Sequence, residues 1–581
     1  MARSHLAKLH TYLRPHYPDL VLGTVALLIV NGLGTYIPWL VKGTVDGLER
    51  GIELQQVINS AVAIAGLASL MWVIRMASRL WIFGVGRKVE YTLKQTVFEH
   101  LLTLPTDYFA ENAAGEIISI VTNDVENIRR LLGFAILSLI NTIFAYALTL
   151  PAMFLINWQL SLLAIAVYPL MFILVQAFSG QLRDEQLKVQ QELSEVSSLL
   201  QEDLNGMALI KTYAQEDYER KVFARLNQRL LTANLEMART RNMLFPLLGG
   251  IASISFLVLL YFGGEALAKP ETNFKVGDLL SLIIYVERLI FPTALLGFVL
   301  TTYQRGQVSI DRVEQILAIP PAIIDTPQTI QIHPAEVRGS ITAKGLTFSY
   351  PNSDQIVLDH LDFHIQGGSI TAIIGEVGSG KTTLVNALVR LIDIAPGQLF
   401  IDDIDITQIA LSDLRQIISY VPQDSFLFSD SIANNLRYGK PLAPLSTVEF
   451  YARKAHIQQE ILNFPKQYDT IVGERGITLS GGQRQRTALG RSLLVESPIL
   501  ILDDALASVD NQTATAILQN LPKGKTVLFI SHNLSVASHA DHILLMDKGK
   551  VVAEGSHQEL LRSSPKYQKL WQQHQLEEVL K

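Results

Sequence analysis

Long uncharged, apolar windows dominate the first half of the chain. Four of them contain no charged residue: 20–41, 54–74, 131–182 and 242–264. A membrane-spanning helix needs about 20 mainly apolar residues, so three windows fit one span each. Window 131–182 is long enough for two, and its only polar break is Asn157-Trp158-Gln159. An interfacial Trp beside Asn favours a tight turn at the membrane surface, so we expect this window to fold back on itself.

A fifth window, residues 279–304, is apolar except for Glu287 and Arg288 and would form the sixth span. The pattern therefore predicts six membrane-spanning helices. Buried core helices are the alternative, but six apolar segments of spanning length are rare in a soluble protein.

Basic residues mark the side of the membrane on which the loops lie. Arg3, Lys8 and Arg14 precede the first window, and the connection between the second and third windows is also rich in Lys and Arg. Positive residues stay in the cytoplasm, so both termini are predicted there. The first window is long and lacks a small-residue cleavage site, which argues against a removable signal peptide.

Two connections, 75–130 and 183–241, are long, charged and rich in helix formers. Their apolar residues recur at helical spacing. We expect both to be spanning helices that continue well into the cytoplasm. A separate soluble insert is the alternative, but neither connection alternates like a strand.

The character of the chain changes after Arg305. A proline-containing stretch from Pro320 to Pro334 is typical of a linker. From Gly339 on, short β-branched runs such as ITAIIG and TVLFIS alternate with helical segments, which predicts an α/β domain with a largely parallel sheet. The predicted domains are a membrane domain at 1–320, a linker at 321–338 and a soluble domain at 339–581.

Composition supports a membrane protein with a soluble part. Of the 581 residues 49% are hydrophobic and 18% charged, and the net charge is −6. These values exclude intrinsic disorder, and the net charge argues against a polyanion binder. The chain has no cysteine, which excludes disulfides, thiol nucleophiles and cysteine-held metals.

The sequence GEVGSGKTT, residues 375–383, follows an apolar strand and opens a helix. It matches the phosphate-binding loop G-x-x-x-x-G-K-[ST]. Backbone N–H groups of such a loop and the positive end of the following helix face phosphate oxygens. Lys381 is expected to neutralise the β- and γ-phosphates, and Thr382 to ligate Mg²⁺. The predicted nucleotide-binding residues here are Gly375, Glu376, Val377, Gly378, Ser379, Gly380, Lys381, Thr382 and Thr383.

A second chemical signal is ILILDD, residues 499–504, an apolar strand that ends in two carboxylates. Asp503 is expected to hold Mg²⁺ and Asp504 to orient the attacking water. A strand that ends in Asp is common, so this assignment depends on the phosphate loop.

The sequence LSGGQRQRTALGRSLL, residues 479–494, lies just before that strand. With it the chain resembles the ATP-binding cassette (ABC) transporters, whose signature is LSGGQ. The resemblance implies that Tyr350 stacks on adenine, that Gln423 joins Mg²⁺ and that His532 lies near the γ-phosphate. Gly473–Gly476 and Leu506–Asp510 resemble two further loops of the family. In the family the signature contacts the γ-phosphate held by the other subunit, which assigns that role to Ser480, Gly481, Gly482 and Gln483.

The whole chain resembles the bacterial half-exporters of the multidrug and lipid-flippase type. Residues 104–128 and 205–217 resemble their two coupling segments. The resemblance implies an α-helical membrane domain, with six helices and long cytoplasmic extensions, followed by an α/β P-loop domain. It further implies ATP and Mg²⁺ as cofactors, an obligatory second half-transporter and a location in the cytoplasmic membrane. The expected substrate is hydrophobic, amphipathic or lipid-like, moved outward by alternating access, and no nucleic-acid partner is expected.

One residue departs from the family pattern. The family has Glu directly after the strand Asp, and this chain has Asp504. Aspartate is one methylene shorter, so its oxygens sit about 1.5 Å back from the water they would hold. In the family such an Asp often marks the weakly hydrolysing half of a heterodimer, and we favour that reading over a slow homodimer. The alternatives are a regulatory half-transporter and a soluble cassette ATPase of DNA repair or chromosome structure.

Glu287 and Arg288 are the remaining anomaly. Ionisable groups at membrane depth are costly and usually face a wet cavity or a partner. They are expected to form either a wall of the translocation path or a structural ion pair with another helix.

Overall fold

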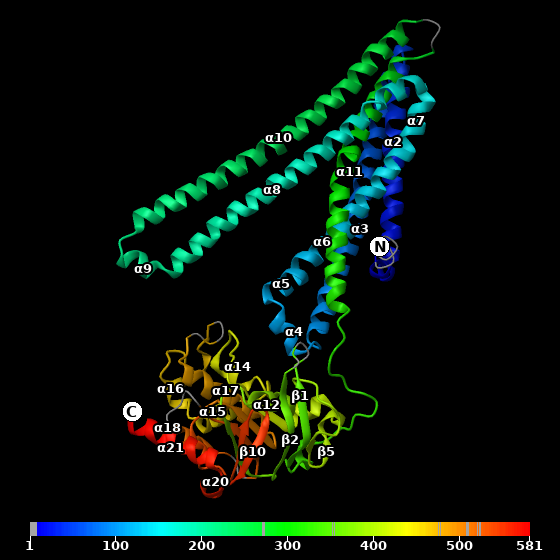
Figure 1. Ribbon diagram of the computed structural model, residues 1–581. Coiled ribbons are helices and arrows are strands. Elements are labelled where there is room, and N and C mark those ends of the chain that lie inside the picture. The colour runs from blue at the N-terminus through cyan, green and yellow to red at the C-terminus, as the bar shows by residue number, and fades with distance from the viewer. Residues whose placement is uncertain are drawn as a thin grey trace. The chain divides into compact units, whose positions relative to one another are not determined.

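The computed structural model describes residues 9–269, 273–350, 353, 355–473, 476, 478–506, 511–519, 521 and 524–580. The chain divides into two compact units (Figure 1). The first, the membrane unit, contains residues 1–102 and 112–319, and the second, the cassette unit, contains residues 103–111 and 320–581.

The membrane unit is made of long helices. The longest are α2 (Tyr17–Glu49), α3 (Leu54–Leu101), α7 (Ile136–Ile165), α8 (Tyr168–Asn205), α10 (Glu216–Ala268) and α11 (Val276–Leu317). Among the described residues, five helical stretches are long and apolar enough to cross a membrane: 9–49, 54–101, 114–205, 249–268 and 276–317. The stretch 114–205 contains the window predicted to fold back, so the number of crossings depends on this segment. The count of six spans stays a prediction.

The predicted reversal lies at Asn157. This residue has non-helical torsion angles (φ −158°, ψ 109°) within α7. Its side-chain oxygen accepts hydrogen bonds from the backbone N–H groups of Gln159 and Leu160, at 3.1 and 3.0 Å. This is the way an N-cap residue opens a new helix. Ser161 Oγ also donates to the carbonyl of Met153 at 2.9 Å. Eight residues of straight helix span about 12 Å, so the chain must turn back here.

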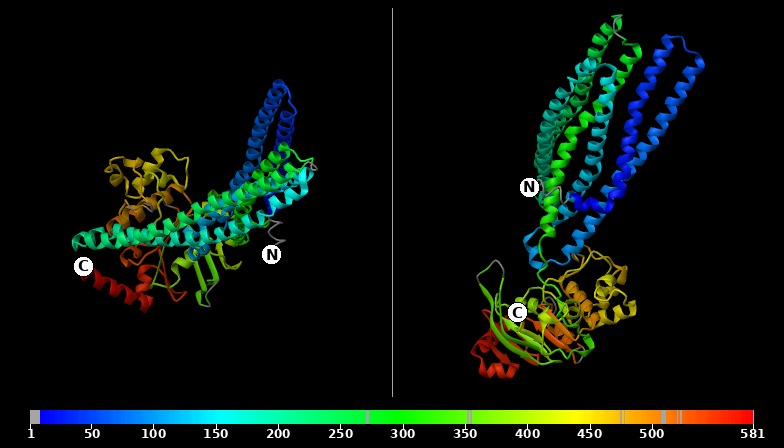
Figure 2. Two further views of the ribbon diagram at one scale, coloured as in Figure 1. Left: turned by 90° about the horizontal axis from the view of Figure 1, so that it is seen from above. Right: turned by 90° about the vertical axis from the view of Figure 1, so that its right-hand side faces the viewer.

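The two polar connections are helical, as predicted. α8 and α10 run side by side and are joined at their ends by α9 (Met207–Thr212) (Figures 1 and 2). The earlier connection continues α3 and then passes through short helical segments into α7. These are α4 (Thr106–Glu111), α5 (Ala114–Ser119), η2 (Ile120–Asp124), α6 (Val125–Arg130) and η3 (Leu131–Ala135). The described residues of both connections contain no strand, and neither connection forms a compact unit of its own, so the separate soluble insert is not found.

The main sheet of the cassette unit has six strands in the order β10-β9-β3-β8-β7-β6. All neighbours are parallel except β9 and β10. The strands are β3 (Ile370–Gly375), β6 (Ile418–Val421), β7 (Ile499–Asp503), β8 (Thr526–Ile530), β9 (His542–Asp547) and β10 (Lys550–Gly555). The largely parallel sheet predicted from the sequence is therefore present.

A second sheet was not predicted. It has four strands in the order β2-β1-β4-β5, and its described pairings are antiparallel. The strands are β1 (Ile341–Ser349), β2 (Ile356–Ile365), β4 (Leu399–Ile401) and β5 (Ile404–Asp405). Two of them are only two or three residues long, too short for a periodic pattern to predict.

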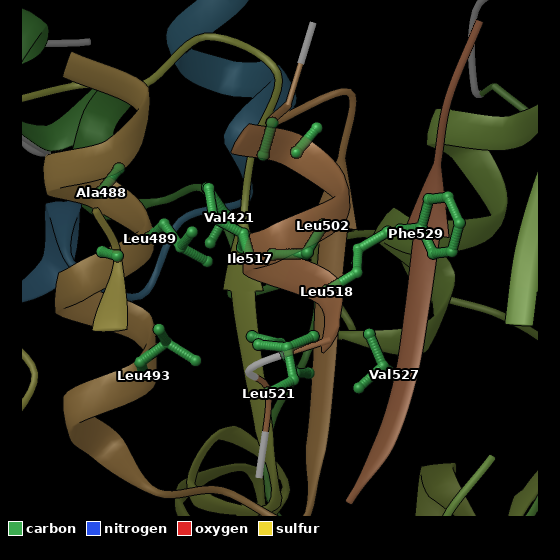
Figure 3. Close-up of a cluster of buried hydrophobic side chains, with 14 of the residues drawn as sticks. Val421, Ala488, Leu489, Leu493, Leu502, Ile517, Leu518, Leu521, Val527 and Phe529 are labelled. Atoms are coloured by element: carbon green, nitrogen blue, oxygen red, sulfur yellow. The ribbon is translucent and has the colours of Figure 1, made fainter. Parts of the chain in front are cut away.

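Both faces of the main sheet are buried. Along β7, Leu500 and Leu502 belong to one apolar cluster, and Ile499 and Ile501 belong to another on the opposite face. Parallel strands covered on both faces are continuous apolar runs rather than alternating ones, as ILILD is. Figure 3 shows α17 (Gly481–Val495) and α18 (Asn511–Gln519) packing their apolar side chains onto the first face.

Further helices complete the cassette unit. They are η4 (Pro334–Glu336), α12 (Lys381–Leu388), η5 (Ile406–Gln408), α13 (Leu411–Ile417), α14 (Ile432–Arg437), α15 (Leu445–Lys454), α16 (Gln458–Leu462), η6 (Gln467–Asp469), α19 (Leu534–Ala537), α20 (His557–Ser563) and α21 (Pro565–Leu580). α12 is the helix predicted after the phosphate loop. η1 (Arg14–His16) precedes α2 in the membrane unit.

Candidate nucleotide site

The carboxyl ends of four parallel strands converge on one cavity. The phosphate loop follows β3, Gln423 follows β6, Asp503 ends β7 and His532 follows β8. Parallel strands end at the same edge of the sheet, so residues far apart in sequence meet there. The cavity measures about 250 Å³ and is lined by Val357, Val377, Gly378, Ser379, Gly380, Lys381, Thr382, Thr383, Gln423, Asp503, Asp504, Ile530 and His532.

The phosphate loop is shaped by its glycines. Gly380 adopts φ 96°, a left-handed conformation that side chains disfavour, and caps the start of α12. A Cβ on Gly375 would lie 2.2 Å from the carbonyl oxygen of Met546, so only glycine fits between β3 and β9. Lys381 Nζ donates to the carbonyls of Gly375 and Glu376, both at 2.8 Å. Burial lowers the pKa of Lys381, while Asp503 and Asp504 act in the opposite direction.

Asp503 is 1% exposed and is held by two hydroxyl groups. Thr382 donates a hydrogen bond to it, and Tyr420 does so over 3.4 Å. Burial raises the pKa of this carboxyl group, the two hydrogen bonds lower it, and the neighbouring Asp504 raises it further. Sequence reasoning did not find Tyr420. Its position on β6, three residues before Gln423, was the available signal.

Asp504 lies just beyond β7 in a strained conformation. Its φ of 49° is unusual for a residue with a side chain, although Asp tolerates it better than most. Its N–H donates to the carbonyl of Ile530 at 3.2 Å. Burial raises the pKa of the Asp504 carboxyl group, and the neighbouring His532 and Lys381 oppose that shift. The structure thus places Asp504, His532 and Lys381 within electrostatic reach of one another.

The donor set of the cavity fits Mg²⁺. A hydroxyl (Thr382), an amide (Gln423) and a carboxylate (Asp503) line the same space, and all offer the oxygen ligands that Mg²⁺ prefers. Among the described residues, no group of three or more His, Cys, Asp and Glu side chains gathers to hold a metal. A site with one or two carboxylates suits an ion that takes its remaining ligands from phosphate oxygens and water.

Tyr350 lies beside the phosphate loop rather than in the cavity. Its hydroxyl is 3.2 Å from Thr383 Oγ1, and its ring packs edge-on against Phe348. This position is next to the first turn of α12.

The signature residues lie elsewhere on the unit. Ser480 caps α17: its Oγ accepts from the N–H of Gln483 at 3.3 Å, and Gln483 Oε1 accepts from the N–H of Ser480 at 2.9 Å. Neither residue lines the phosphate-loop cavity, and neither do Gly481 and Gly482. Gly481 instead borders a neighbouring cavity of about 560 Å³, together with Gln423 and Phe426.

Two motifs of the resemblance lie partly outside the described residues. These are Glu474 and Arg475 of the GERG loop, and residues 507–510 of the LASVD loop.

In the membrane unit, Glu287 and Arg288 face different surroundings. Arg288 borders a cavity between helices, whereas Glu287 is exposed and borders another hollow. Within the described part of the chain neither forms an ion pair, so the structural ion pair considered above is not found.

An apolar helical unit joined to an α/β unit with a phosphate loop and paired carboxylates defines a membrane transporter driven by a nucleoside triphosphate. Residues 20–293 match the family model of the ABC transporter transmembrane region, and residues 358–507 match that of the ABC transporter. The chain belongs to the ABC transporter family.

Relatives extend the match over the full length. A probable multidrug resistance ABC transporter ATP-binding/permease protein of Bacillus subtilis is 31% identical and covers 99% of this chain and 98% of its own. An ATP-dependent lipid A-core flippase of Syntrophus aciditrophicus is 31% identical, and the match covers 96% of this chain and 92% of the flippase. The structure of a bacterial Atm1-family ABC exporter with ATP bound matches with a TM-score of 0.76 and 25% identity, and covers 95% of this chain and 98% of that one.

These findings establish the general activity. The chain is a membrane-embedded transporter that binds nucleotide and couples ATP hydrolysis to transport. The resemblance seen in the sequence is therefore confirmed, as are the ABC-exporter fold and its helical and cassette parts.

Proposed function

We propose that this chain is one half of an ATP-driven exporter that moves a hydrophobic or amphipathic substrate outward by alternating access. The observation that carries the proposal is the separation of two motifs within one cassette. The phosphate loop, Asp503 and His532 share a cavity, while Ser480–Gln483 lies outside it. A second chain that brings its own signature to this cavity would complete the site. ATP would then clamp two cassettes together and bias the helical units between two states.

Each residue of the site has a role in this proposal. Lys381 and the N–H groups of the loop and α12 bind the β- and γ-phosphates. Thr382, Gln423 and Asp503 would hold Mg²⁺, which neutralises phosphate charge when it is bound. Asp504 and His532 hold and orient the attacking water, and Asp504 accepts its proton. Tyr350 offers its ring to the adenine.

The arrangement in the membrane is part of the same proposal. Basic residues crowd the segment before the first apolar window and the connection around Arg129 and Arg130. Positive residues remain on the cytoplasmic side, so both termini and the cassette lie in the cytoplasm. In a bacterium this places the chain in the inner membrane.

Asp504 favours a heterodimer as the working assembly. Its side chain is one methylene shorter than Glu, and displacements of about 1 Å at a reacting group cost about 100-fold in rate. A partner with Glu at this place would carry most of the turnover, and this chain would contribute its signature. A slow homodimer is the second candidate.

Reconstitution tests the export proposal directly. Purified protein in lipid vesicles should accumulate a hydrophobic or amphipathic dye in an ATP-dependent manner, alone or with a partner half-transporter. Lys381→Ala should abolish both ATP hydrolysis and accumulation, because the triphosphate loses its main cation. Lys454→Ala is the matched control, since Lys454 ends α15 and lines neither the phosphate-loop cavity nor the one beside it. Hydrolysis and accumulation unaffected by Lys381→Ala would overturn the proposal.

A further inference from the structure

The cavity that Arg288 borders lies inside the membrane unit, far in sequence from the phosphate loop. It measures about 450 Å³ and is bounded by α2, α3, α7, η3 and α11. Its polar lining combines the guanidinium groups of Arg75, Arg79 and Arg288 with Asn31, Asn141, Ser78 and Ser138. Its apolar lining is Leu27, Val30, Phe83, Phe134, Leu137, Ala145, Phe291, Pro292 and Leu295.

Arg288 is fixed in place by α2. Its Nη2 donates to the backbone carbonyl and the side-chain oxygen of Asn31, at 2.8 and 3.1 Å. Asn31 is itself buried and donates through Nδ2 to Asn141 Oδ1 on α7, at 3.0 Å. A Cβ on Gly34 would lie 2.3 Å from Arg288 Nη1, so the glycine provides the space for the guanidinium group. Contacts that involve α11, α2 and α7 therefore fix the position of this arginine.

No described acidic residue compensates the positive charge of the cavity. Within the described residues, none of the three arginines forms an ion pair, whereas Arg87, further along α3, pairs with Glu90 at 3.0 Å. Arg288 Nη1 is buried and has no hydrogen-bond partner. A buried cation without a counter-charge is costly in a medium of low dielectric constant, and a bound anion would remove that cost.

The remaining lining describes the rest of the ligand. Three phenylalanines and several aliphatic side chains share the cavity with the arginines, so an inorganic anion would leave this apolar surface uncovered. A molecule with an anionic head and an apolar body would satisfy both parts of the lining. A lipophilic cation of similar size would be repelled by the same three charges.

We propose that Arg75, Arg79 and Arg288 form a binding site for the anionic head group of an amphiphile, such as an acidic lipid. This inference names the substrate class of the proposed exporter and so rests on that function. Arg288 is the fixed anchor, and Arg75 and Arg79, which line the cavity from α3 and are more exposed, would contact the head from the other side.

Direct binding without ATP tests the site separately from transport. The full-length protein in a neutral detergent is titrated with dodecyl phosphate, and binding is followed by calorimetry. The comparison probes are dodecylphosphocholine, dodecyltrimethylammonium and inorganic phosphate, and phosphatidylglycerol competes as the lipid source of the same chemistry. We expect dodecyl phosphate to bind and phosphatidylglycerol to displace it. The other three probes should bind at least about 10-fold more weakly, because each lacks either the charge-assisted hydrogen bonds or the apolar contacts.

Variants locate the binding. Replacement of any one of the three arginines by glutamine should weaken the binding of dodecyl phosphate by about 10-fold or more; the variants are Arg288→Gln, Arg75→Gln and Arg79→Gln. Arg288→Lys should recover part of the lost affinity because it keeps the charge. Arg87→Gln, on the same helix but ion-paired, is the matched control and should bind as wild type does. Lys381→Ala should also bind normally, so a failure of export and a failure of this site are told apart.

Three results would overturn the proposal. The first is unchanged binding in both Arg288→Gln and Arg75→Gln. The second is equal binding of dodecylphosphocholine or dodecyltrimethylammonium, which would remove the charge preference. The third is full competition by millimolar inorganic phosphate without any contribution from the alkyl chain, which would reduce the site to one for a free anion.

Discussion

At the scale of single residues, Asp503 combines a functional position with an energetic cost. Burial raises the pKa of this carboxyl group, so the folded state holds its proton more tightly than the unfolded chain does. The stabilisation linked to that proton is present at acid pH and is lost as the pH rises through the folded-state pKa. Above that pKa the ionised carboxylate therefore lowers the stability of the cassette.

Asp503→Asn removes that ionisation and keeps an oxygen to accept from Thr382 and Tyr420. We expect the nucleotide-free variant to melt at a higher temperature than wild type at pH 8, with a smaller difference at pH 5, and to lose ATP hydrolysis. Thermal melts of the full chain at the two pH values measure this.

Asp359 serves as the control because its pKa shifts in the opposite direction. Hydrogen bonds from His360 and Lys550 lower the pKa of Asp359. Asp359→Asn should not raise the melting temperature at pH 8. A lower melting temperature for Asp503→Asn at both pH values would contradict the explanation.

Asp504 decides between the two assemblies. If this chain works with a Glu-bearing partner, it should hydrolyse ATP slowly or not at all when purified alone. Asp504→Glu should then raise its rate by about 10- to 100-fold, because the longer side chain reaches the water. Vanadate-sensitive ATPase of the chain alone measures this.

Asp504→Asn provides the matched variant, because Asn also tolerates the left-handed backbone found here. It should be mild in a heterodimer and severe in a working homodimer. Fast, substrate-stimulated ATP hydrolysis by the unmodified chain alone would contradict the heterodimer proposal.

At the scale of elements, the N-terminus of α17 has a structural and a proposed functional task. The capping box of Ser480 and Gln483 satisfies free N–H groups of the helix. Loss of an N-cap side chain costs about 1 kcal/mol. The Ser480→Arg variant should lose about this much stability. It should in addition block ATP hydrolysis at the partner's site, while ATP still binds to the phosphate loop of the mutated chain.

The control for Ser480 is Ser556, which caps α20 with Glu559 in the same type of capping box. Ser556→Arg should show a similar loss of stability with normal hydrolysis. Titration with a fluorescent ATP analogue and ATPase assays on mixed dimers separate the effects. Collapse of binding to the mutated chain's own loop would show that the cross-subunit assignment is wrong.

The reversal within α7 depends on one side chain. Asn157 Oδ1 accepts two backbone hydrogen bonds that open the following helical segment. Asn157→Ala should lower the unfolding free energy by about 1–2 kcal/mol, and Asn157→Asp should lower it less because it still accepts both bonds. Thermal melts of the full chain in detergent compare the stability of wild type, Asn157→Ala and Asn157→Asp. Equal melting temperatures for all three would show that the cap does not hold the turn.

At the scale of the whole molecule, the site is proposed to be shared between two chains. The absence of cysteine allows each contact to be tested with single introduced thiols. Val377 on the phosphate loop is 91% exposed. A chain with Val377→Cys and a second chain with Ser480→Cys should form a cross-linked dimer with a short bis-maleimide in the presence of ATP and vanadate.

Ser556→Cys replaces Ser480→Cys in the control pair and should give no such product. Formation of the dimer regardless of nucleotide, or in the control pair alone, would contradict a closed interface between phosphate loop and signature. The measurement needs only denaturing gels of the full-length chains.

Some features of this protein followed from its sequence alone, because their signals are local. Spanning length, the turn at Asn157, the long helical connections and the strand before the phosphate loop each depend on residues near one another. The nucleotide motifs were found for the same reason, since loop glycines and a lysine must be adjacent to wrap a phosphate.

Only the tertiary structure decided which distant residues meet. The order of the parallel strands brings Gln423, Asp503 and His532 to one edge, and it adds Tyr420, which no motif had marked. Likewise, Arg288 was visible as an anomaly in an apolar window, but its neighbours were not. Arg75, Arg79 and Asn31 come from two other helices, and helix packing sets their proximity. Periodicity gives the face of a helix but not the identity of its neighbour, so sequence could locate the charge and not its surroundings.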